Sequence, residues 1–166
     1  MSKMDTVWIT TGSTTVEAMI NPLAAACNGD GIDQSFVPDT VYFLDNPGLG
    51  DALSDAKTLT RELLEQHGVE SPSIRTHTIE HETDFDALVE YFRATVETAR
   101  ENDAEIAIDV TPGRKFMSVF AFNAGTTYDV DHIFYLYLSS SEYFSRIYQT
   151  IPRTAVELFD FTEVLG

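Results

Sequence analysis

The stretch Ile106-Ala-Ile-Asp-Val-Thr-Pro-Gly-Arg-Lys115 brings three local patterns together. Ile106 to Val110 is a short apolar run, as expected for a buried strand. Thr111-Pro-Gly113 is a turn sequence, because proline presets φ and glycine tolerates positive φ. A helix from Arg114 to about Thr127 follows, and its apolar residues occur on nearly every side. The stretch therefore predicts a strand–turn–helix unit, the building block of a parallel α/β sheet.

The same alternation of strands and helices continues on both sides of this unit. Apolar runs predict further strands at Val7–Thr11, Val41–Leu44, Ile74–Ile79 and Ile133–Leu138. Helical spacing predicts helices from Val16 to Cys27, from about Asp51 to His67, and from Thr83 or Asp84 past Val96. Pro22 lies inside the first of these helices. It either kinks that helix or begins a second one, with Asn21 as its cap.

These elements predict a single domain over residues 1–166 with a Rossmann-like α/β fold. The expected sheet is open and parallel, with strand order 3-2-1-4-5 and helices on both faces. The tail contains two strand-like pieces, around Ile147 and at Val156–Phe161, which predict a short C-terminal β extension. Ligands of such sheets bind outside the carboxyl ends of the strands, where the strand order reverses.

The composition is strongly acidic. The chain has 27 Asp plus Glu against 10 Lys plus Arg, and a net charge of −17. Such a surface is typical of a halophilic protein, because at molar salt the Debye length is about 3 Å and self-repulsion is screened. Duplex DNA is not an expected partner, since binding it needs many basic contacts to phosphates.

Other sequence features indicate where the protein works. The chain has neither a signal-peptide pattern nor an apolar stretch of about 18 residues, so we expect a cytoplasmic protein with no membrane partner. The lone Cys27 excludes an internal disulfide and a multi-cysteine metal site. No P-loop and no G-x-G-x-x-G motif occurs, which disfavours standard nucleotide triphosphatases and dinucleotide oxidoreductases. We expect no cofactor.

Two loops at the expected ligand-binding edge suit a small anion. The first is Thr10-Thr-Gly-Ser-Thr14, whose backbone N–H groups, hydroxyls and helix dipole favour a phosphate, although Ser and Thr also serve as ordinary helix caps. The second holds Arg114-Lys115, the only adjacent basic pair in the chain. Cations in a first helical turn are unfavourable unless an anion or nearby acids offset them. The residues expected to bind the anion are Thr10, Thr11, Gly12, Thr14, Thr111, Gly113 and Arg114.

Four further titratable residues have structural interpretations. Asp109, at the end of the fourth strand, is either a general base or, as we favour, the residue that orients the following turn. His77 and His81 have metal-ligand spacing, but a strand running into a turn is expected to leave them on an exposed polar edge. His132, at the start of the fifth strand, is expected to be exposed.

The two loops together resemble the CARF (CRISPR-associated Rossmann fold) domain family. The resemblance rests on Thr10-Thr-Gly-Ser13 after the first strand and on Asp109-Val-Thr-Pro-Gly-Arg-Lys-Phe-Met-Ser118 opening a helix. That family often has a D-x-T-G-G-x-K-x-M-like run at the second loop, where Pro112 here replaces the first glycine. The resemblance extends from Val7 to about Leu138.

The resemblance implies a ligand and a mechanism. CARF domains bind cyclic oligoadenylates, the messengers of type III CRISPR antiviral defence, across a two-fold dimer interface. Because the chain ends soon after the fifth strand, we expect a stand-alone member, and such members include ring nucleases. These enzymes cleave the ring without a metal, through attack by its own 2′-hydroxyl. Ser13 and Lys115 match the catalytic positions, and cyclic tetra-adenylate is the expected ring.

The implied homodimer needs an apolar surface. The helix Lys115–Gly125 and the aromatic tail around Tyr143–Tyr148 have more apolar surface than one sheet face requires, so we expect either or both at the interface. Two alternatives to a ring nuclease stay open. One is a sensor that binds the messenger and acts through a partner protein, and the other is an unrelated α/β domain with a different anionic ligand.

Overall fold

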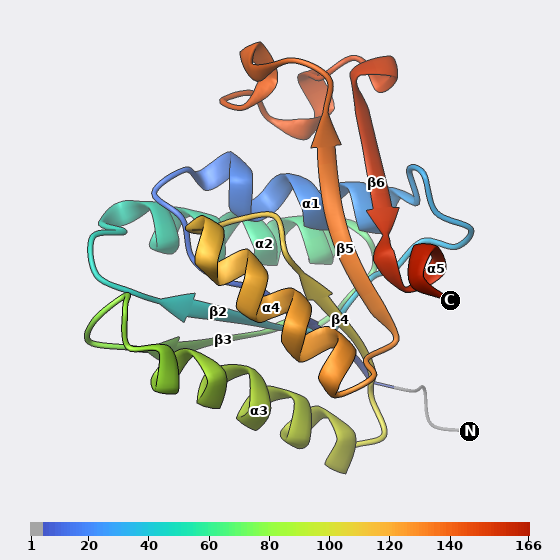
Figure 1. Cartoon of the computed structure of the whole chain (residues 1–166). Coiled ribbons are helices and arrows are strands. Elements are labelled where there is room, and N and C mark those ends of the chain that lie inside the picture. The colour runs from blue at the N-terminus through green and yellow to red at the C-terminus, as the bar shows by residue number, and fades with distance from the viewer. Residues whose placement is uncertain (1–4) are drawn as a thin grey trace.

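The computed structural model describes residues 5–166 and shows one mixed sheet between two layers of helices (Figure 1). The sheet has the order β3-β2-β1-β4-β5-β6. Strands β1 to β5 are parallel, and β6 pairs antiparallel with β5. The predicted order 3-2-1-4-5 is confirmed, and β6 is the predicted C-terminal extension. The strands are β1 (Thr6–Ile9), β2 (Thr40–Asp45), β3 (Ser73–Thr78), β4 (Glu105–Asp109), β5 (His132–Leu138) and β6 (Val156–Asp160).

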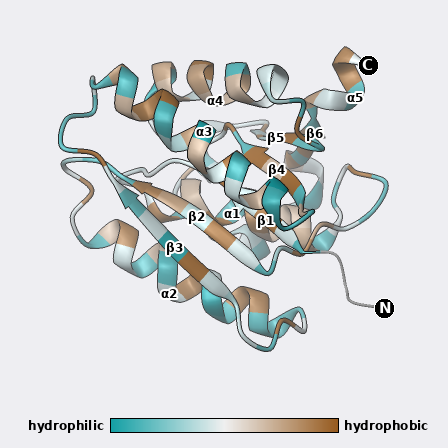
Figure 2. Cartoon of the chain, turned by 90° about the horizontal axis from the view of Figure 1, so that it is seen from below, coloured by the Kyte–Doolittle hydropathy of each residue, from teal (hydrophilic) through white to brown (hydrophobic). Residues whose placement is uncertain are grey.

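Helices bury both faces of the sheet. The pair α1 (Val16–Asn28) and α2 (Asp51–Gln66) covers one face, and the pair α3 (Phe85–Glu101) and α4 (Lys115–Thr127) covers the other (Figure 1). Adjacent residues of β1 divide between the two cores: Trp8 packs with α1 and α2, whereas Ile9 packs with α3 and α4. Figure 2 shows the hydrophobic stretches of the strands between these layers. No helix within residues 5–166 has the length and apolar character needed to cross a bilayer.

The tail after β5 differs from the prediction. The prediction of a strand around Ile147 is wrong, because the chain there forms short 3₁₀ helices. Asn21 explains the difference: its Nδ2 donates to the carbonyl of Arg146 (2.8 Å), and its Oδ1 accepts from the N–H of Tyr148 (2.9 Å). Asn21 is therefore not a helix cap, and α1 runs through Pro22 without a break. The 3₁₀ helices are Ser141–Tyr143, Tyr148–Thr150 and Arg153–Ala155, and the short helix α5 (Phe161–Leu165) follows β6.

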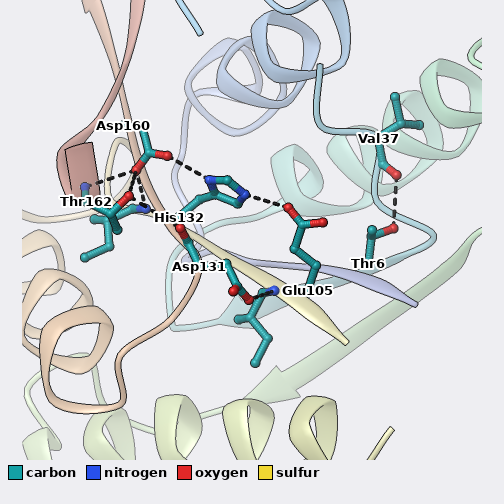
Figure 3. A network of polar contacts seen from close by, with 9 residues as sticks. Thr6, Val37, Glu105, Asp131, His132, Asp160 and Thr162 are labelled. Carbon is teal, nitrogen blue, oxygen red and sulfur yellow. Dashed lines mark hydrogen bonds and ion pairs between the residues drawn. The ribbon is translucent and has the colours of Figure 1, made fainter. Parts of the chain in front are cut away.

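His132 joins three strands at the amino-terminal edge of the parallel sheet (Figure 3). Its Nδ1 lies 2.7 Å from Oδ2 of Asp160 on β6, and its Nε2 lies 2.6 Å from Oε1 of Glu105 on β4. The imidazole stacks on Phe134, with 5.2 Å between ring centroids. The expectation of an exposed His132 is wrong, because only 28% of its side chain is accessible. Carboxylates on both neighbouring strands hold it in place.

This arrangement makes the folded protein less stable at alkaline pH than near neutral pH. Burial alone would lower the pKa of His132, but its hydrogen bonds to Asp160 and Glu105 outweigh burial and raise the pKa from 6.5 to about 9. The stabilisation from the charged imidazole is therefore complete below pH 6.5 and is lost as pH rises through about 9. We expect wild type to lose roughly 2 kcal/mol of unfolding free energy over this window.

Urea unfolding at pH 6.5 and 9.5, followed by Trp8 fluorescence, measures this loss. The variant His132→Gln keeps a polar side chain but cannot titrate, so its unfolding free energy is expected to change much less between the two pH values. Equal losses in wild type and variant would contradict the role given to the imidazolium.

Candidate functional site

A hollow of about 310 Å³ opens where the loops after β1, β2, β3 and β4 meet. It lies at the carboxyl edge of the parallel strands, next to β1, which pairs with both β2 and β4. This is the switch point at which ligands of open α/β sheets bind. The hollow is lined by Gly12, Ser13, Thr14, Asn46, Pro47, Gly48, Leu49, Glu82, Gly113 and Arg114.

The β1–α1 loop supplies free backbone donors. Within residues 5–166, the N–H groups of Gly12, Ser13 and Thr14 donate to no other group. Ser13 Oγ accepts from the N–H of Thr15 (3.0 Å), so it shapes the turn into α1 while it lines the hollow. Gly12 is required by space, since a Cβ there would lie 2.5 Å from the carbonyl oxygen of Leu44. The loop thus has unpaired N–H groups on residues that line the hollow, and such groups can bind an anion.

The β4–α4 loop packs directly against the β1–α1 loop. Thr11 Oγ1 donates to the carbonyl of Pro112 (3.0 Å). Gly113 has a φ of +88°, and a Cβ there would lie 2.8 Å from Thr11 Oγ1. Glycine is therefore needed both for the backbone conformation and for the close approach. The contact brings the start of α4, with its cap residue Arg114 and its first residue Lys115, close to the β1–α1 loop.

Asp109 connects the two loops through hydrogen bonds. It is fully buried, accepts from Thr10 Oγ1 (3.1 Å) and from the N–H of Thr111 (2.9 Å), and does not line the hollow. Burial, only partly offset by the hydrogen bonds from Thr111 and Thr10, raises its pKa to about 7. The favoured interpretation of Asp109 as the residue that orients the turn agrees with this geometry, whereas a general base would need access to a ligand.

Three threonines expected to bind the ligand have other contacts. Thr10 and Thr11 are buried between the loops, through the hydrogen bonds described above. Thr111 Oγ1 accepts from the N–H of Leu136 on β5 (3.0 Å). Thr111 lines a different, apolar hollow beside β5. All three therefore shape the site rather than line it. Of the predicted residues, the structure gathers Gly12, Ser13, Thr14, Gly113 and Arg114 around the hollow.

The two adjacent cations have different surroundings. Arg114 lines the hollow and pairs with Glu82 from the β3–α3 loop, with 3.2 Å between Nη2 and Oε1. The sequence left open whether an anion or nearby acids offset the basic pair, and for Arg114 a nearby acid does so. Lys115 is exposed, forms no ion pair with another residue of the described chain, and lies beside the hollow rather than in its lining.

Five lining residues were not predicted from the sequence: Asn46, Pro47, Gly48, Leu49 and Glu82. Asn46 directly follows β2, and Glu82 lies between β3 and α3. The available signal was positional: in a 3-2-1-4-5 sheet, the residue after strand two must reach the same edge as the loop after strand one. His77 and His81 are exposed, as expected, and the described residues hold no cluster of three or more His, Cys, Asp or Glu side chains that could bind a metal.

Known structures share this fold. Can2 from Sulfobacillus thermosulfidooxidans, in complex with cyclic tetra-adenylate, is 16% identical over 82% of the chain, with a TM-score of 0.58. Csm6 from Enterococcus italicus, bound to cyclic hexa-2′-fluoro-hexa-dAMP, is 18% identical over 98%, with a TM-score of 0.62. A type III CRISPR defence DNA nuclease activated by cyclic oligoadenylate is 14% identical over 84%, with a TM-score of 0.61.

The chain spans only part of each of these proteins: 32% of Can2, 45% of Csm6 and 20% of the nuclease. No curated protein matches it by sequence. The family model described as CRISPR-associated protein NE0113 matches residues 53–159, which is more than half of the chain. The chain therefore belongs to this family of CRISPR-associated proteins, and the CARF fold expected from its two loops is confirmed.

Proposed function

We propose that the chain binds a cyclic oligoadenylate at the hollow, with cyclic tetra-adenylate as the expected ring, and cleaves it. The observation that carries the proposal is the meeting of free backbone N–H groups with Arg114 in the lining of one hollow, with the unpaired Lys115 of the described chain directly beside it, in a protein of net charge −17. Such a concentration of donors and cations favours a phosphate-bearing ligand. Proteins of the same fold are complexed with cyclic tetra-adenylate or with a cyclic hexanucleotide analogue.

The size of the hollow supports a homodimer. At about 310 Å³ the hollow lies at the lower end of the volume range for small-ligand pockets. A ring of four nucleotides is too large to be enclosed by one such hollow. Two copies related by a two-fold axis would present two hollows to a ligand that has the same symmetry. The segments expected at the interface carry exposed apolar residues, since Val119 on α4 is 67% exposed and Phe144 in the tail is 58% exposed.

Cleavage requires position and positive charge. In the proposed reaction the ring's 2′-oxygen forms a bond to the adjacent phosphorus, and the bond from phosphorus to the 5′-oxygen breaks. The 2′-hydroxyl loses a proton and the leaving 5′-oxygen gains one, which yields a 2′,3′-cyclic phosphate and a 5′-hydroxyl. Ser13 would position the ribose, and Lys115 would stabilise the charge that develops on the phosphorane. The reaction as written needs no metal.

A sensor that binds without cleaving is the second candidate. It is favoured by the position of Lys115, which is exposed beside the hollow instead of lining it. In that case the cations hold the ring and a partner protein carries the response. The two candidates differ in whether purified protein converts the ring to a linear product.

Replacing Lys115 tests the proposed cleavage mechanism. In single-turnover cleavage of labelled cyclic tetra-adenylate at molar potassium salt, Lys115→Ala is expected to slow the reaction about 10²-fold, as for the loss of one charged transition-state donor. Ser13→Ala is expected to slow it less, because neighbouring N–H groups remain. Lys57→Ala, which removes the same charge from α2, is the matched control and is expected to cleave at the wild-type rate.

Chelation by EDTA is expected to leave the wild-type rate unchanged. An EDTA-sensitive reaction, or a Lys115→Ala protein as fast as wild type, would rule out the proposed mechanism. Binding of the ring without any product would establish the sensor instead.

Glu82 is expected to weaken ring binding. Its carboxylate occupies Arg114, which a ligand phosphate would otherwise contact. The pair is partly exposed, so the competition is modest: we expect Glu82→Gln to tighten ring binding about two- to fivefold, in line with surface ion pairs. Glu97→Gln is the control, because Glu97 pairs with Arg93 on the surface of α3 and its loss changes the net charge equally. Equal affinities of the two variants would contradict this competition.

A further inference from the structure

We infer that Asn46 distinguishes a ribose ring from a deoxyribose ring by hydrogen-bonding a 2′-hydroxyl of the ligand. The inference rests on the proposed function, since it assumes that a cyclic oligonucleotide occupies the hollow. It concerns a residue of the β2–α2 loop, which the sequence pattern did not indicate.

Asn46 is a buried polar side chain without a partner. Only 6% of the residue is exposed, and its Oδ1 has no hydrogen bond. Its Nδ2 likewise donates to no group among residues 5–166. A buried amide costs free energy unless it is paired, so an unpaired one beside a hollow is available to a ligand through the amide atom that faces the hollow. Trp8 and Thr60 also have unpaired buried atoms, but neither lines this hollow.

The amide lies next to the loop that carries the free N–H groups. Its Oδ1 would be 3.2 Å from a Cβ placed on Gly12, and Asn46 itself lines the hollow. Asn46 directly follows Asp45, the last residue of β2, so the sheet fixes its backbone. A ligand whose phosphate meets the N–H groups of the β1–α1 loop therefore places its adjoining sugar within reach of Asn46.

The chemistry of the amide selects a hydroxyl. Oδ1 accepts, Nδ2 donates, and a half-turn of the side-chain amide exchanges them. A phosphate oxygen only accepts and an adenine amino group only donates, whereas a hydroxyl does both and so pairs with the amide in either orientation. A two-bond contact to the adenine edge would need both amide atoms open to the ligand, and Oδ1 is covered. In a 3′–5′-linked ring, the free hydroxyls are the 2′-hydroxyls, which distinguish RNA from DNA.

The test compares ring affinities of wild type and Asn46→Leu, which keeps the approximate shape and removes both polar atoms. The probes are cyclic tetra-adenylate and its 2′-deoxy analogue, in a competition assay read before cleavage accumulates. Wild type is expected to prefer the ribose ring about tenfold, the value of one hydrogen bond to a buried partner. Asn46→Leu is expected to bind both rings equally, with the wild-type affinity for the deoxy ring.

Two controls make the outcome specific. Asn123→Leu, on the exposed side of α4, is expected to keep the tenfold preference. The melting temperature of Asn46→Leu is expected to be no lower than that of wild type, because an unpaired buried amide has been replaced by an apolar group. An Asn46→Leu protein that keeps the ribose preference, or that instead stops distinguishing cyclic tetra-adenylate from cyclic tetra-inosinate, would overturn the inference. Wild type that binds neither ring would instead overturn the proposed function.

Discussion

The site depends on the buried carboxylate of Asp109. It joins β1 to the β4–α4 loop by accepting from Thr10 and from Thr111, and Thr111 continues the connection to Leu136 on β5. Burial raises the pKa of Asp109 to about 7, and the hydrogen bonds from Thr111 and Thr10 oppose this rise. One carboxylate thus fixes the relative position of the two loops that carry the free N–H groups and the adjacent cations. The hollow exists because both loops leave the sheet together.

Much of the fold could be predicted because its signals are local. Apolar runs, helical spacing and turn residues such as Thr111-Pro-Gly113 define the parallel strands, and chain connectivity then restricts their order. The tail could not be predicted in the same way. The residues around Ile147 have a strand-like composition, but their backbone groups bond to Asn21, which is 125 and 127 residues away from its two partners. His132 was misjudged for the same reason, since both of its carboxylate partners lie on other strands.

In the site, too, residues placed by local sequence patterns could be predicted, and contacts with distant residues could not. The glycines and Ser13 could be placed because strand–loop–helix junctions in a parallel sheet share one edge. Which hydroxyls face the hollow was not predictable, because Thr10 and Thr11 turn towards partners about 100 residues away. Glu82 and Asn46 come from loops without a motif, and only the sheet order brings them to Arg114 and Gly12. Together they give the hollow a neutralised cation and an unpaired amide in addition to its N–H groups.

The central claim is that two copies of the chain share one cyclic oligoadenylate at the carboxyl edge of their sheets. Calorimetric titration of cyclic tetra-adenylate into the protein at molar potassium salt, with light scattering on the same samples, tests it most directly. The account predicts a dimer and a stoichiometry of one ring per two chains. A monomer that binds one ring per chain, or a protein that binds no ring, would contradict it.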